Sequence, residues 1–299
     1  MVVPAYNAAL HLQAALASVQ TQTFSDFELI IVDDGSTDRT KAILDRFAST
    51  EPRLRVVSRP NTGIVGALND GLAVARGEFI ARMDADDITL PARFETQLAY
   101  LRAHPECGAL GTDILYTDPE GDPLIRHRPA LTHDAIVTQL LEGNGGAIIH
   151  PTLVVRRKTM EEIGGYRPET MNFLEDLDLY LRLADVGQLA NLPDVHLHYR
   201  QHLKSINRMP GPREALRLQI VNPYRARQNL PPLLPSPPDV DAPQNPSDWR
   251  RHWAYDAARG GHWKSARKNA CRACFGRPFD RRNWQGLSYM LSAARAASA

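Results

Sequence analysis

Short apolar runs alternate with stretches of helical periodicity along the first hundred residues. The runs predict four strands, at residues 2–3, 27–32, 54–57 and 78–81. Apolar residues at every third or fourth position predict helices between them, among them one at residues 65–75 and one that starts near Pro91. This repeated strand–helix order is typical of the α/β class, with a parallel sheet covered by helices on both faces.

The helix that follows the first strand is predicted from its cap and its apolar spacing. Asn7 stands at a suitable N-cap position, and Leu10, Ala14 and Val19 have the spacing of one helix face. We therefore expect Asn7 to cap a helix that buries these three side chains.

After residue 105 the pattern no longer alternates regularly. It predicts a strand at residues 147–155, a short helix at 156–163, a leucine-rich helix at 173–184 and a strand at 195–199. Seven prolines within residues 229–248 indicate a stiff linker. The expected organisation is a domain over residues 1–210, a helical connection at 211–228, the linker at 229–248 and a basic helical region at 249–299.

The net charge of +1 conceals an uneven distribution. Residues 249–299 contain eleven Lys or Arg and two Asp, a net charge of +9, so the rest of the chain carries −8. Four tryptophans lie in the same basic region. Two interpretations are equally well supported: the region contacts an anionic partner, such as a membrane surface, or it is a helical subdomain that packs on the preceding domain. A helical face that is merely solvated would also explain the charge. A nucleic-acid partner is disfavoured, because only the charge supports it.

The cysteines and the apolar runs bear on the compartment. Three cysteines provide no disulfide framework, and the pair Cys271 and Cys274 lacks the further ligands of a zinc site. No apolar run reaches the ~18 residues of a membrane span, and the first residues do not resemble a signal peptide. We therefore expect a cytoplasmic protein, with peripheral attachment to the inner face of the membrane as the alternative.

Polar side chains gather where three of the predicted strands end. Tyr6 and Asn7 follow the first strand, Asp33 and Asp34 end the second, and a group of aspartates follows the fourth. Because open α/β sheets bind their ligands at the carboxyl ends of strands, this placement indicates a binding site.

The group after the fourth strand consists of Asp84, Asp86 and Asp87. In an extended segment the side chains of Asp84 and Asp86 point the same way, and two such carboxylates suit Mg²⁺ or Mn²⁺ bound to a diphosphate. The alternative is a solvated acidic turn in which Asp87 caps the helix that starts near Pro91. The position at the sheet edge makes the two interpretations about equally well supported.

Two further carboxylate pairs are candidates for chemistry. Asp33 and Asp34 can accept the imide N–H of uracil or another base edge, although a turn with a helix cap explains part of their surroundings. Glu175 and Asp176 open the leucine-rich helix, whose N-terminus favours an ionised Asp176 that can act as a general base. The alternative is that this pair only complements the helix dipole.

These residues belong to eight short motifs that occur in a characteristic order. The motifs are Val2-Val-Pro-Ala-Tyr-Asn7, Val32-Asp-Asp-Gly-Ser-Thr-Asp38, Asn61-Thr-Gly63 with Ala67-x-Asn69-x-Gly71, Ala75-Arg-Gly77-Glu78, Met83-Asp-Ala-Asp-Asp87, His150-Pro151-Thr152, Gly164-Gly-Tyr166 and Glu175-Asp176-x-Asp178-x-x-x-Arg182. In this set, residues 1–207 resemble the inverting family 2 glycosyltransferases. The resemblance implies a GT-A fold with a mixed sheet, a nucleotide-binding half over about 1–105 and an acceptor half over about 106–210.

The resemblance also implies a role for each matching residue. Nucleotide binding would fall to Pro4, Tyr6, Asn7, Asp33, Asp34 and Asp84, with Asp84 near the ribose. Asp86 would hold the divalent metal, Mn²⁺ or Mg²⁺. Asp176 would be the catalytic base, and Glu175 would orient the acceptor.

The resemblance further implies that a later segment, residues 199–206, closes over the diphosphate. Within it, His202 would be a further metal or phosphate contact, and Arg200 and Ser205 would contact the diphosphate or the acceptor. Arg200 and Lys204 would add positive charge there.

The reaction implied is transfer of a sugar, with inversion, from a nucleotide sugar, most often UDP-linked, to a hydroxyl of a glycan or lipid-linked acceptor in cell-surface polysaccharide synthesis. Two alternatives are weighed against it. A sugar-nucleotide pyrophosphorylase would carry a glycine-rich, basic loop where this chain has Pro4-Ala-Tyr-Asn7. A non-catalytic sugar-nucleotide-binding protein would not need Asp84, Asp86 and Asp176.

Overall fold

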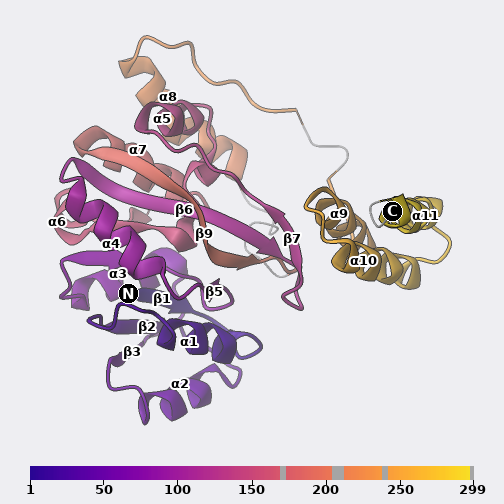
Figure 1. The fold of residues 1–299 in the computed structure, drawn as a ribbon. Helices are drawn as coiled ribbons and strands as arrows, with labels where there is room; N and C mark the ends of the chain where they lie inside the picture. The colour runs from indigo at the N-terminus through magenta and orange to yellow at the C-terminus, as the bar shows by residue number, and fades with distance from the viewer. Residues whose placement is uncertain (169–172, 204–211, 238–241, 297–299) are drawn as a thin grey trace. The chain divides into compact units, whose positions relative to one another are not determined.

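The computed structural model describes residues 1–168, 173–203, 212–237 and 242–296, and their chain forms two compact units. The first unit comprises Met1–Ile114, Arg128–His198 and Pro210–Pro235. The second comprises Leu115–His127, Tyr199–Met209 and Ser236–Ala299. Each unit is therefore assembled from segments that are far apart in the sequence (Figure 1).

A three-stranded parallel sheet forms the N-terminal part of the first unit. Its order is β1 (Val2–Ala5), β2 (Leu29–Asp33) and β3 (Leu54–Ser58). The connecting helices are α1 (Leu12–Gln20), α2 (Thr40–Ala48) and α3 (Ile64–Val74). Every residue of the central strand β2 is buried, as its unbroken apolar run predicted.

A second, six-stranded sheet contains the fourth predicted strand, so only the first three predicted strands form the expected parallel ladder. Its members are β4 (Phe79–Ala81), β8 (Val154–Arg156), β6 (Cys107–Thr117), β9 (Gln188–Arg200), β5 (Ile88–Thr89) and β7 (Pro123–Arg126). Strand β4 pairs antiparallel with β8, and only a parallel bridge between Val2 and Arg82 connects this segment to β1. The pairing partner of a strand is a long-range property that local apolar pattern does not encode.

Helices cover the second sheet and supply much of the core. They are α4 (Arg93–Ala103), α5 (His133–Leu141), α6 (Arg157–Glu162), α7 (Glu175–Val186) and α8 (Arg213–Arg227). Leu177 and Leu181 of α7 share one buried cluster with Ile136 of α5 and Val221 of α8. The predicted helices at 65–75, 156–163 and 173–184 are confirmed to within a few residues.

Two local predictions are wrong. The strand expected at 147–155 is replaced by two 3-10 turns, at Gly145–Ala147 and His150–Thr152, with strand structure only from Val154 onward. Pro151 has no N–H to donate to a sheet, which explains why the strand starts after it.

The first helix also differs from its prediction. Leu10 is 85% exposed, and the buried face of α1 is instead formed by Leu12, Ala15, Leu16 and Val19. Asn7 does not cap α1; its side chain accepts hydrogen bonds from Thr37 and Asp38 at the start of the α2 segment.

The second unit is built around three helices. These are α9 (Pro246–Arg259), α10 (Trp263–Gly276) and α11 (Arg281–Ala296), and they bury Trp253 and Met290 with Leu124 of β7. Helix α9 begins at Pro246, inside the proline-rich segment, because Asn245 caps it by accepting from the N–H groups of Ser247 and Asp248. None of the described helices is both long and apolar enough to span a bilayer.

Candidate active site

Three aspartates form an acidic group in the loop between β4 and β5. One carboxylate oxygen from each of Asp84, Asp86 and Asp87 lies within 4.8 Å of the other two. Helix α4 starts at Arg93 without a side-chain cap, so the helix-capping role considered for Asp87 is wrong. Asp87 is instead buried beside the other two aspartates. Three oxygen donors at this spacing are a set that Mg²⁺ or Mn²⁺ prefers.

Arg82 fixes the position of Asp84. Its two terminal nitrogens lie 2.9 Å and 2.6 Å from the two carboxylate oxygens of Asp84. Burial opposes the charge on Arg82, but the attraction of Asp84 and Glu175 raises its pKa above the ordinary value. The buried guanidinium therefore stays charged, and sequence reasoning gave it no role.

Glu175 and Asp176 occupy the first turn of α7. Burial and the neighbouring charge of Asp176 raise the pKa of Glu175 to about 7. Burial also raises the pKa of Asp176, although the N–H of Leu177 donates to its Oδ1 at 2.8 Å. The helix terminus was expected to favour the ionised pair, but burial outweighs it. Near neutral pH this pair can therefore both hold and accept a proton.

His150 and Tyr166 are buried neighbours of the carboxylate pair. His150 Nδ1 lies 3.7 Å from Glu175 Oε1, and its Nε2 lies 2.8 Å from the hydroxyl oxygen of Tyr166. Burial and the charge of Arg82 lower the pKa of His150 well below its usual value, so the ring is neutral. Both residues stand in quoted motifs, and that was the only signal for them in the sequence.

Two further residues approach the pair from other elements. Gly145, in the first 3-10 turn, lies so close that a Cβ there would be 3.2 Å from Asp176 Oδ1. Arg213 opens α8; burial lowers its pKa, and the attraction of Glu175 and Asp176 partly offsets this effect. Arg213 therefore places a positive charge near the acid pair. The sequence had predicted only that its helix connects two parts of the chain.

The residues expected to bind the nucleotide lie at the carboxyl ends of β1 and β2. Asp33 accepts from the N–H of Ser36 at 3.1 Å. Both carboxylate oxygens of Asp34 accept from the loop after β3, from the N–H groups of Thr62 and Gly63 at 3.1 and 2.8 Å. These aspartates therefore also fix the loops around the site.

The first of these loops holds the remaining expected contacts. Asn7 adopts φ 48°, a conformation that asparagine tolerates, and joins this loop to the α2 segment. Tyr6 is exposed, and Pro4 is half-buried in β1.

The residues expected to close over the diphosphate belong to the second unit. Arg200 is buried there, and it donates to the carbonyl of Pro119 at 3.0 Å. His202 lies two residues further on, whereas Lys204 and Ser205 lie outside the described residues.

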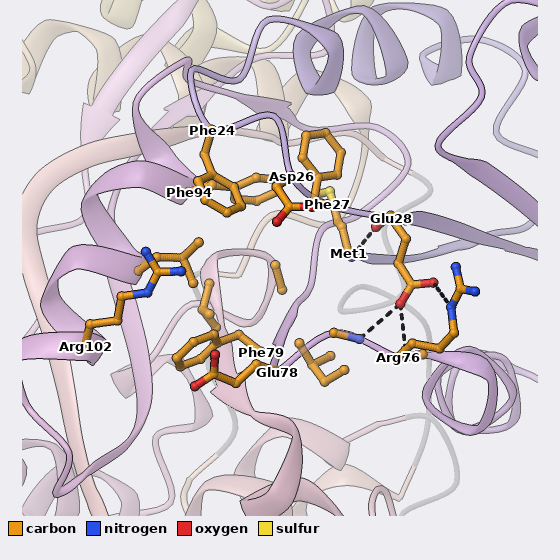
Figure 2. A pocket seen from close by; sticks show the side chains of 16 residues that line it. Met1, Phe24, Asp26, Phe27, Glu28, Arg76, Glu78, Phe79, Phe94 and Arg102 are labelled. Carbon is orange, nitrogen blue, oxygen red and sulfur yellow. Dashed lines mark hydrogen bonds and ion pairs between the residues drawn. The ribbon is translucent and has the colours of Figure 1, made fainter.

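A separate cavity of about 370 Å³ lies away from these groups, at the amino ends of β1, β2 and β4 (Figure 2). Figure 2 shows the rings of Phe24, Phe79 and Phe94 around it, and the carboxylate of Glu28 tied to Arg76. It contains none of the motif residues that carry candidate chemistry.

Comparison with known sequences agrees with the motifs. Residues 1–164, more than half of the chain, match the model of the family described as Glycosyl transferase family 2. The chain is 32% identical over 203 residues to the amylovoran biosynthesis glycosyltransferase AmsE of Erwinia amylovora, an alignment that covers 67% of this chain and 74% of AmsE. Of the first curated relatives that it matches, the chain spans between 65% and 74% of the length.

Solved structures share the fold. TarS 1–349 of S. aureus, in complex with UDP-GlcNAc, matches with a TM-score of 0.60 at 15% identity, over 99% of this chain and 91% of that one. The mannosyltransferase PcManGT from Pyrobaculum calidifontis, in complex with GDP-Man and Mn²⁺, matches with a TM-score of 0.52 at 21% identity, over 98% and 84%. The mixed α/β sheet of the GT-A fold is confirmed. The chain belongs to glycosyl transferase family 2.

Proposed function

We propose that this glycosyltransferase moves a sugar from a nucleoside diphosphate sugar to an acceptor hydroxyl with inversion at the anomeric carbon. The observation that carries the proposal is that two clusters of carboxylates, each suited to a different part of the reaction, occur in one unit. A trio of aspartates suited to a metal lies after β4, and a buried acid pair of raised pKa opens α7. Arg82 interacts electrostatically with both.

The three carboxylates fit a divalent cation, Mn²⁺ or Mg²⁺, because they offer close, hard oxygen donors. Asp86 and Asp87 would hold the ion, with Asp84 turned toward the ribose by Arg82. When bound, the ion would offset the negative charge of the leaving diphosphate. The Mn²⁺ complex of PcManGT supports this assignment.

In the proposed reaction Asp176 accepts the proton of the acceptor hydroxyl. The oxygen forms a bond to the anomeric carbon, and the bond from that carbon to the diphosphate breaks on the opposite face. Glu175 orients the acceptor, while neutral His150 restricts the position of the Glu175 carboxyl. Pro4, Tyr6, Asn7, Asp33 and Asp34 would surround the nucleobase of the donor.

The donor is proposed to be UDP-linked, as in the TarS complex with UDP-GlcNAc. The name of AmsE, an amylovoran biosynthesis glycosyltransferase, supports a glycan or lipid-linked acceptor. Peripheral contact with an anionic membrane, where a lipid-linked acceptor would be found, is part of the same proposal.

The test compares two substitutions in the full-length protein. Asp176→Asn should bind UDP with Mn²⁺ as the wild type does, yet lose sugar transfer by at least about a hundredfold, because general-base catalysis contributes that much. Asp86→Ala should weaken metal-dependent UDP binding and transfer together. Full activity of Asp176→Asn would remove Asp176 as the base.

A further inference from the structure

Most of the basic charge in the second unit is neutralised within that unit. Six of the ten Lys and Arg side chains described between residues 249 and 293 form ion pairs with its carboxylates. They are Arg250, Arg251, Arg259, Lys268, Arg272 and Arg282. Trp253 is fully buried, with Trp249 and Trp263 packed against the same core. Neither the whole net charge nor the tryptophans as a set therefore form a binding surface.

Two exposed rings lie at the end of α10 and in the turn that follows it, and the four other cations lie on α10, in this turn and at the start of α11. Phe275, near the end of α10, is 86% exposed, and Phe279, in the turn before α11, is 98% exposed. Lys264 and Arg267 share one helix face with Phe275, because residues separated by three and eight positions recur on the same side. Arg277 and Arg281 flank Phe279 in the sequence. The structure shows no carboxylate partner for these four cations within the described residues.

A third ring is held beside the same turn. The indole N–H of Trp284 donates to the carbonyl of Pro278 at 2.6 Å, and the ring is 52% exposed. Buried Asn283 donates to the carbonyls of Ala273 and Arg277, so that the end of α10 is tied to α11. The turn is thereby fixed, and its rings do not fold back into the core.

We name this surface the aromatic tip: the rings of Phe275, Phe279 and Trp284 with the cations of Lys264, Arg267, Arg277 and Arg281. An aromatic side chain offers ~150–250 Å², so three partly exposed rings present on the order of 500 Å². A stable protein interface needs about 800 Å² from each partner, which disfavours a second copy of the chain. Rings that project beside unpaired cations suit a surface with phosphates above an apolar layer.

We propose that the aromatic tip docks the protein on an anionic phospholipid surface, with the rings in the interfacial layer and the cations at lipid phosphates. This inference rests on the proposed function only in that a lipid-linked acceptor would be found at such a surface. Binding to vesicles can be measured without any sugar transfer.

The experiment is co-sedimentation of the full-length protein with vesicles at low salt. The protein should bind vesicles that contain phosphatidylglycerol, and bind phosphatidylcholine vesicles much less. The double substitution Phe275→Ser with Phe279→Ser should lower the partition coefficient about tenfold or more, from the loss of apolar insertion. Arg277→Glu with Arg281→Glu should lower it at least about tenfold, since each cation near the surface contributes to the attraction.

Matched controls exclude general effects of polarity and charge. Leu234→Ser removes another exposed apolar side chain, and Lys158→Glu reverses another exposed charge; both should bind vesicles as the wild type does. Equal thermal unfolding by circular dichroism would show that the tip variants are folded. UDP binding, followed by calorimetry, should be unchanged in them, and its absence in the wild type would count against the proposed function alone.

Several results would overturn the docking proposal. Equal binding to both kinds of vesicle, or unchanged binding by the ring variant, would do so. Binding to single-stranded RNA without binding to vesicles would assign the cations to nucleic acid. A dimer in sedimentation velocity that the ring substitutions dissociate, with no vesicle binding, would assign the tip to a second copy.

Discussion

Arg82 connects the two carboxylate groups of the site. Taking its charge out of water costs several kcal/mol unless a partner compensates, and Asp84 supplies that partner with both oxygens. The same contact leaves the Asp84 carboxylate one orientation before a ligand arrives. Preorganisation of this kind lowers the entropy cost of binding.

Arg82→Lys tests this connection, because lysine keeps the charge but lacks the two-pronged geometry. We expect the Kd for UDP with Mn²⁺ to rise about tenfold, since a charged hydrogen bond contributes roughly 1.5–3 kcal/mol. Calorimetry measures it. Arg76→Lys, at an exposed ion pair with Glu28, is the control and should bind UDP normally. Unchanged affinity in Arg82→Lys would show that UDP binding does not depend on the bidentate contact between Arg82 and Asp84.

The acid pair predicts a pH dependence of transfer. Burial and Asp176 raise the pKa of Glu175 to about 7, so protonation of the pair increases as the pH falls below that value. A protonated base cannot accept the acceptor proton, and kcat/KM should therefore fall on the acid side of about pH 7. A profile from pH 5 to 9 measures this limb. Glu175→Gln should move the limb to lower pH, whereas a flat wild-type profile down to pH 5 would contradict the assignment.

The same raised pKa has an opposite effect on stability. The native state binds more protons at Glu175 than the unfolded chain does between about pH 4.5 and 7. Its contribution to the free energy of unfolding is therefore greatest below this window and is lost as the pH rises through 7. Stability and activity thus respond to this carboxyl in opposite directions.

The sequence predicted the candidate acids better than their environment. Asp84, Asp86, Glu175 and Asp176 were identified from short motifs, because their spacing along the chain is itself the signal. Arg82 and His150 were given no role, since their contacts with the acids depend on long-range packing. The raised pKa of the pair was also missed, because burial cannot be read from a helix start.

At the scale of elements, the 3-10 turn at Gly145–Ala147 lies against the proposed base. A Cβ at residue 145 would be 3.2 Å from Asp176 Oδ1, closer than ordinary contact. The turn therefore limits where the carboxylate can move, and only a residue without a side chain fits there unchanged.

Gly145→Ala should displace the Asp176 carboxylate by a few tenths of an ångström. We expect kcat to fall about tenfold with little change in the KM for the donor, because small misplacements of a catalytic group reduce rates strongly. Steady-state kinetics separates the two parameters. Gly146→Ala is the matched control: its Cβ would press on Asn144 and lies near no atom of Asp176. Equal losses in both variants would indicate a general disturbance of the turn.

Elements with a strong local pattern were predicted well. The leucine stripe of α7 fits only a helix with one buried face, and the unbroken apolar run of β2 fits a buried strand. The run at 147–155 was misread because apolar residues around Pro151 fit a strand and a buried turn equally. The buried face of α1 was predicted wrongly, because alanine is common on both exposed and buried helix faces.

At the scale of the whole molecule, the second unit depends on an acidic turn from the middle of the chain. Asp118, in the turn between β6 and β7, is fully buried, and it forms an ion pair with Lys268 and accepts from Asn269 at 2.8 Å. Lys268 also pairs with Glu120 and Asp122. One cation thus contacts three carboxylates, of which Glu120 also pairs with Arg250 and Arg272. The sequence showed an acidic body and a basic tail, but not that these residues would meet.

Lys268→Met should therefore destabilise the protein strongly. Removing one partner of a buried ion pair costs about 3–5 kcal/mol, because the other charge remains buried without compensation. Urea unfolding followed by tryptophan fluorescence measures the loss, since Trp253 lies in the core of this unit. Lys264→Met is the control: Lys264 lies on the same helix and forms no ion pair with any described residue, so this variant should unfold like the wild type. Equal stability of the two variants would show that Asp118 is compensated in another way.

The pairing of Asp118 with Asn269 spans 151 residues of sequence and has a consequence during synthesis. At ~5–20 residues per second, the ribosome needs about 8–30 seconds to deliver α10 after the acidic turn has been made. Until then the Asp118 carboxylate lacks Lys268, the cation that pairs with it in the folded unit, and the turn remains exposed to solvent. The second unit can therefore close only after α10 has been made, and a stop before residue 268 would leave its acidic half permanently unassembled.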